Sequence, residues 1–107
     1  MDTAVNIEGN INVSDDGSWS YSWAWTYSGD GSLSDAHEEF LITDQSGLII
    51  DSVREASHSV DPGQTYLGGG SGNRQLPSGD LRWKLHVIQG GGFLGVTGAN
   101  FFSASSR

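Results

Sequence analysis

The chain has 107 residues, no cysteine and a formal charge of −8 at pH 7. A chain of this length builds one hydrophobic core, so we expect a single domain over residues 1–107. The lack of cysteine excludes disulfides, thiol catalysis and thiolate metal sites. The negative charge disfavours binding to nucleic acid or to an anionic membrane surface, and the apolar runs are too short for a membrane span.

Residues 5–28 alternate between two kinds of side chain, which predicts two antiparallel strands. From Val5 to Val13 every second side chain is apolar or Gly, and Asp15-Asp16-Gly17 has the chemistry of a tight turn. The second strand, residues 18–28, carries aromatic residues on one face and small residues, mostly hydroxylated, on the other. The aromatic face consists of Trp19, Tyr21, Trp23, Trp25 and Tyr27.

This aromatic face has two interpretations. Each aromatic side chain buries about 150–250 Å² on folding, so the row can supply much of the core. Alternatively, part of the row lies exposed, where it stacks on sugar rings or contacts another protein chain. We expect Trp23 and Trp25 to lie in the core, and Trp19 and Tyr27, at the ends of the strand, to be more exposed and available to a partner.

The rest of the chain predicts five further strands. They are expected at residues 38–44, 48–54, 64–67, 81–88 and 95–104, and only residues 53–59 have any helical possibility. Residues 68–79 are too rich in glycine for a strand interior and predict a flexible loop. Seven short strands in about 100 residues are typical of a two-sheet antiparallel sandwich, so we predict an all-β fold of that class.

In the strand at 81–88, Leu81, Trp83, Leu85 and Val87 alternate with polar residues. We therefore expect Trp83 to be almost fully buried. On the opposite face, Arg82, Lys84 and His86 are expected to pair with acidic residues across the sheet.

A short motif precedes this strand. The stretch from Leu76 to Val87 reads Leu-Pro-Ser-Gly-Asp-Leu-Arg-Trp-Lys-Leu-His-Val. It resembles the corner before the penultimate strand of immunoglobulin-like and fibronectin-type modules, and the strand spacing of the whole chain is similar to theirs. An immunoglobulin-like strand order implies that the loops 28–36, 57–63 and 90–95 gather at one end of the sandwich. The two cysteines of antibody domains are absent, which excludes a true antibody-type domain.

The segment Gly90-Gly91-Gly92-Phe93-Leu94-Gly95 matches the G-x-G-x-x-G spacing of dinucleotide-binding folds. That fingerprint must open a helix in a parallel β-α-β unit, whereas the residues after it are strand-like. We interpret the segment as the tip of a hairpin. Its apolar residues, Phe93 and Leu94, either fold back over the end of the sandwich or face a partner.

No arrangement of residues predicts catalysis. Glu38 and Glu39 are adjacent on a strand and point to opposite faces, so they cannot flank one glycosidic bond. The three histidines have no zinc-ligand spacing, and the oxygen-bearing residues at 28–35 lack the EF-hand pattern of a calcium loop. We therefore expect no enzymatic activity, no cofactor and no resident metal.

These features favour a non-enzymatic structural or protein-interaction module. Its expected partner is protein, through self-association or a larger extracellular, filamentous or virion assembly. The alternative is a carbohydrate-binding module that uses the aromatic strand face. The residues expected to contact the partner are Trp19, Tyr27, Phe93 and Leu94.

Overall fold

The computed structural model describes residues 5–90 and 92–104, which form eight β-strands and no helix. The described part of the chain therefore contains no helix that could cross a membrane. The strands are β1 (Val5–Val13), β2 (Trp19–Tyr27), β3 (Leu33–Asp44), β4 (Ile49–Arg54), β5 (His58–Val60), β6 (Thr65–Ser71), β7 (Gly79–Gln89) and β8 (Gly92–Ser103).

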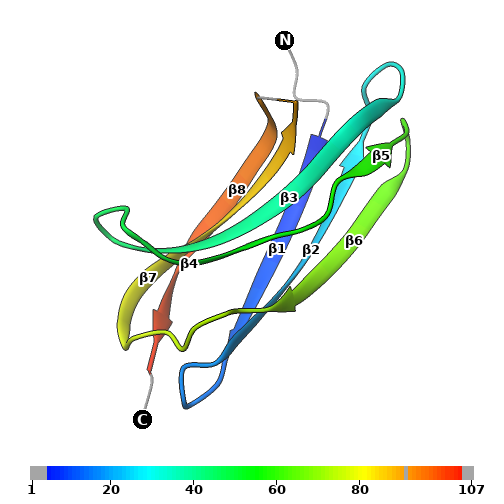
Figure 1. The fold of residues 1–107 in the computed structure, drawn as a ribbon. Helices are drawn as coiled ribbons and strands as arrows, with labels where there is room; N and C mark the ends of the chain where they lie inside the picture. The colour runs from blue at the N-terminus through cyan, green and yellow to red at the C-terminus, as the bar shows by residue number, and fades with distance from the viewer. Residues whose placement is uncertain (1–4, 91, 105–107) are drawn as a thin grey trace.

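The strands form two antiparallel sheets that pack face to face (Figure 1). The three-stranded sheet has the order β1-β2-β6, and the five-stranded sheet has the order β4-β3-β7-β8, with β5 also paired to β3. The predicted all-β, two-sheet antiparallel sandwich is confirmed. Eight strands rather than seven are present because the short β5 was not expected, and the possible helix at residues 53–59 does not form.

The glycine-rich segment was partly misassigned, because β6 runs through Ser71 and includes Gly68–Gly70. The reason is tertiary. A methyl group on Gly68 would collide with the Trp23 ring, and one on Gly70 would lie 3.2 Å from the Tyr21 hydroxyl. Glycine is needed in this strand because the aromatic rings of β2 occupy the space that side chains would fill.

The whole aromatic row of β2 points into the sandwich. Trp19 is 4% exposed and Tyr27 is 6% exposed, so the expectation that these two residues are more exposed and available to a partner is wrong. Segments distant in the sequence cover both ends of the strand. The Trp19 indole packs on Gly72 and bonds Asp51, while the backbone of Tyr27 is bonded by Gln64 and Gly63.

The centre of the core is a stack of rings that joins the two sheets. Phe40 stacks on Tyr21 at 4.7 Å and on Trp83 at 5.2 Å between ring centroids. Trp83 is buried, as predicted, and its ring lies over Gly9 of the opposite sheet, where a methyl group would approach to 2.7 Å. The large rings therefore fit in a small domain because glycines face them.

The three loops expected to gather at one end of the sandwich do so, apart from residue 91, which lies outside the described residues. Gly63 N donates to Tyr27 O at 2.7 Å, and Ser32 Oγ donates to Asp61 Oδ1 at 2.6 Å. Gln89 Nε2 at the end of β7 donates to Ser34 O at 3.1 Å. These bonds tie the β2–β3 loop both to the β5–β6 turn and to the β7–β8 hairpin.

Candidate functional site

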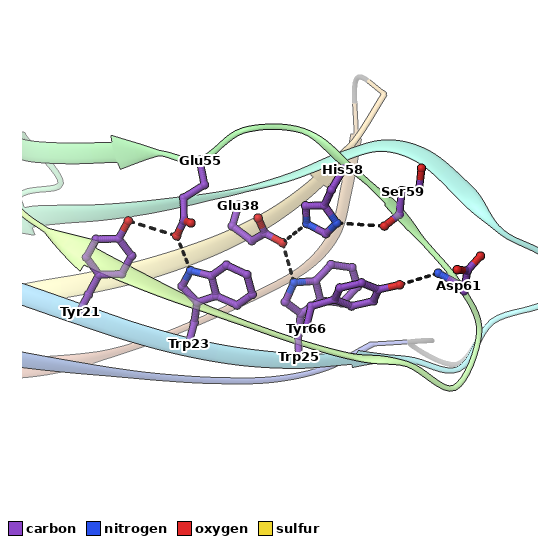
Figure 2. Close-up of polar contacts among 9 residues, drawn as sticks. All are labelled: Tyr21, Trp23, Trp25, Glu38, Glu55, His58, Ser59, Asp61 and Tyr66. Atoms are coloured by element: carbon purple, nitrogen blue, oxygen red, sulfur yellow. Dashed lines mark hydrogen bonds and ion pairs between the residues drawn. The ribbon is translucent and has the colours of Figure 1, made fainter.

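Acidic side chains of the five-stranded sheet and of the segment after β4 face the aromatic row of β2 (Figure 2). Glu55 Oε2 accepts hydrogen bonds from Tyr21 Oη at 3.1 Å and from Trp23 Nε1 at 2.5 Å. Burial, and then the charge of Glu55, raise the pKa of the Tyr21 phenol well above its ordinary value, so the phenol stays a donor. Buried indole and phenol groups need such acceptors, and these carboxylates supply them.

Asp51 is the corresponding hydrogen-bond acceptor at the Trp19 end of the row. Its Oδ2 accepts from Trp19 Nε1 at 3.0 Å and from the backbone N–H groups of Asn73 and Arg74 at 2.8 and 2.9 Å. Burial alone would raise the pKa of Asp51, but these donors outweigh it and the pKa is lowered. Asp51 therefore stays ionised and fastens the segment after β6 to β4.

Glu38, the most buried carboxylate of the described residues, pairs with His58. Glu38 is 1% exposed, and its Oε2 lies 2.8 Å from Trp25 Nε1 and 2.7 Å from His58 Nε2. His58 Nδ1 lies 3.0 Å from Ser59 O, which can only accept, so Nδ1 carries a proton. Burial alone would lower the pKa of His58, but the bonds to Glu38 and Ser59 and the nearby carboxylates outweigh it and raise the pKa.

An open cavity of about 360 Å³ borders this network between β6 and the β4–β5 segment. Its lining includes Trp23, Glu38, Glu55, His58 and Tyr66. The carboxylates here already bond indole, phenol and imidazole groups of the protein itself, and Tyr66 Oη accepts from Asp61 N at 2.7 Å. We assign the cluster a structural role, because it satisfies the buried donors of an aromatic core.

The outer face of β7 and β8, termed here the β7–β8 face, differs from this interior. Phe93, Val96 and Phe102 of β8 are 64%, 54% and 66% exposed. They lie on the same side of the sheet as Arg82, Lys84 and His86, since His86 pairs with Val96, Lys84 with Gly98 and Arg82 with Asn100. These residues, with Asp80, Ile88 and Asn100, make up the face.

The cations of this face are not paired with acids in the way the sequence suggested. Arg82 Nε donates to Asn100 Oδ1 at 3.0 Å, and Lys84 lies opposite Leu41 on one side and Gly98 on the other. Because Gly98 has no side chain, a shallow groove of about 480 Å³ opens beside the lysine. Of the three basic residues, only His86 has an acidic cross-strand neighbour, Glu39.

At the hairpin tip, the two apolar residues have different surroundings. The Phe93 ring contacts His86 edge-on at 4.9 Å, and Leu94 packs against the core. Burial lowers the pKa of His86, and the charge of Lys84 lowers it further against the opposing effect of Glu39. The ring that Phe93 contacts is therefore mostly neutral at pH 7.

Of the four predicted contact residues, the structure leaves only Phe93 largely exposed, because Trp19 and Tyr27 are buried and Leu94 is half-buried. Val96 and Phe102 were missed as surface residues. The alternation that buries Trp83 turns Arg82 and Lys84 outward, but the sequence does not show which residues of β8 lie beside them, because the register shifts between Val87 and Ile88.

Within residues 5–90 and 92–104, no group of three or more His, Asp or Glu side chains is placed to hold a metal ion. Comparison of the sequence with known protein families and with curated proteins finds no match.

Proposed function

We propose that this chain is a non-enzymatic sandwich module, of immunoglobulin-like or fibronectin-type strand order, that binds a protein partner through the β7–β8 face. The strand order supports the first part. The first two strands share a sheet with β6, and β3 shares the other sheet with the last two strands, as in immunoglobulin-like sandwiches. Strand β4 lies beside β3 rather than beside β6.

The observation that carries the functional part is the exposure of Phe93, Val96 and Phe102 on one strand that also adjoins Arg82 and Lys84. Exposed apolar patches rimmed by polar residues mark interaction sites in soluble domains. Aromatic residues and arginine are also the residue types enriched at protein interfaces. A core-facing role cannot explain the three side chains, because they lie on the face of the sheet opposite to the buried residues of β7, which are Leu81, Trp83, Leu85 and Val87.

Carbohydrate binding by the aromatic strand face has less support. A sugar-stacking platform needs ring faces in the open, and each aromatic residue of β2 is buried against the opposite sheet. The geometry therefore favours a protein partner.

Site-specific photocrosslinking in the cells that make the protein tests the proposal. A benzophenone amino acid replaces Phe93 or Phe102 in the test variants, and it replaces Leu67 in the control. Leu67 is 77% exposed on β6, in the opposite sheet. We expect discrete protein adducts from positions 93 and 102 and none from position 67. Equal labelling at all three positions, or no protein adduct from β8, would contradict the proposed function.

A further inference from the structure

We infer that the partner is a second copy of this chain, and that two copies pair along the free edge of β8. This inference rests on the proposed function, whose surface it extends from the side chains to the backbone. An edge strand presents unpaired N–H and C=O groups, which are a template for a strand of another chain. The dimer would join two five-stranded sheets into one.

Strand β8 has the features of a pairing edge. It is the last strand of its sheet, with β7 as its hydrogen-bonded neighbour among the described residues. Its twelve residues span about 40 Å when extended. It contains no charged residue and no proline, which are the usual devices that prevent edge pairing.

The other edges are protected or poorly suited to pairing. Strand β1 carries Glu8. Strand β4 carries Asp51 and Arg54. Strand β6 is uncharged, but three of its seven residues are the glycines 68–70, which offer no side chains to pack beside a partner strand.

Charge explains why the occupant is a second copy. The chain has a formal charge of −8, so two copies repel each other at most surfaces. The β8 edge is the exception, because none of its residues is charged. An uncharged strand can also pair with itself about a two-fold axis without opposing like charges, as a symmetric dimer requires.

The hairpin half of β8 packs against β1 of the other sheet, which limits the residues of β8 that are available to a second copy. Gly95 lies against Val5 and Ile7 of β1, where a methyl group would approach the Ile7 side chain to 2.6 Å. The free part is therefore the half from Val96 to Ser103. Antiparallel pairing over that half would bring Val96 and Phe102 of the two copies onto one continuous surface.

Sedimentation velocity of the purified chain, from micromolar to millimolar concentration, tests the inference. We expect a monomer–dimer equilibrium in the native chain. Val96→Lys places an ammonium group on the pairing edge and should weaken the dimer about tenfold or more. Leu67→Lys adds the same charge at a more exposed position, on β6, and should leave the dimer unchanged. Phe102→Lys repeats the test near the other end of β8, and the melting temperature of each variant establishes that it folds.

Two results would overturn the inference. One is a native chain that stays monomeric up to millimolar concentration. The other is a dimer that neither β8 variant weakens, or that Leu67→Lys weakens equally. In both cases, photocrosslinks from positions 93 and 102 to a different protein would leave the proposed function standing, whereas absence of any crosslink would remove both.

Discussion

Strands β2 and β8 are both rich in aromatic residues, but the molecule uses them differently. In β2 every ring is buried, glycines make room for the largest rings, and carboxylates accept the indole protons. In β8, Phe93 and Phe102 lie on the outer face with nothing of the described chain covering most of their surface. The comparison shows that aromatic content does not distinguish a core from a contact surface. The two are distinguished by the residues that surround each ring.

Truncation of one ring in each strand should give the largest difference in stability between β2 and β8. Trp25→Ala removes a fully buried side chain and leaves Glu38 without its indole donor. We expect it to lower the free energy of unfolding by about 3–5 kcal/mol. Phe102→Ala should change it by less than about 0.5 kcal/mol, as an exposed position does. Chemical denaturation measures both, and equal losses would show that β8 is as structural as β2.

The next effect concerns the glycines that face the rings. Gly68→Ala places a methyl group in the Trp23 ring and should cost about 1–3 kcal/mol through overpacking. Gly92→Ala is the matched control, because a methyl group at Gly92 of β8 meets nothing within 4 Å. Thermal melts of the two variants compare them. If Gly68→Ala melts with the native protein, then the aromatic row is not closely packed against β6.

A smaller difference should separate the two residues of the hairpin tip. Leu94→Ser removes a half-buried side chain that packs on the core and should destabilise the fold by about 1 kcal/mol. Phe93→Ser should leave the melting temperature unchanged and weaken the binding of a protein partner to the β7–β8 face. The reverse pattern, with Phe93→Ser the destabilising change, would mean that Phe93 covers its own sandwich rather than a partner.

The smallest expected effect is the pH dependence of the His58–Glu38 pair. The pKa of His58 is raised from its ordinary value of 6.5, so the folded state binds the proton more tightly than the unfolded state. The stabilisation is complete below the unfolded pKa and is lost as pH rises through the folded pKa. We expect the native protein to melt above His58→Gln at pH about 6 and to lose that advantage by pH about 9. A difference that grows with pH would contradict the assigned protonation.

The sequence predicted the parts of the fold that depend on local pattern. Alternation located most strands and the burial of Trp83, and Asp15-Asp16-Gly17 forms a turn with Gly17 in the left-handed region at φ 90°. What it could not predict depends on contacts between distant segments. Trp19 is buried because Asp51 and the chain beyond β6 close over it, and no local pattern contains that information.

The candidate surface was predictable only in part, because its exposure also depends on how distant strands pair. Phe93 was identified from its place in a glycine-rich tip. Val96 and Phe102 required knowledge of which face of β8 turns outward, and that follows only from the pairing of β8 with the outward-facing residues of β7. The partners of the buried indoles were missed because Glu38 was considered only as half of a catalytic pair.

Hydrogen–deuterium exchange at low and high protein concentration compares β2 and β8 in one measurement. We expect β2 amides to be protected at every concentration, whereas amides in the Val96–Ser103 half of β8 gain protection as the concentration rises. Unchanged exchange in β8 across that range, or a gain that falls on β6 instead, would contradict a buried β2 and a pairing edge on β8.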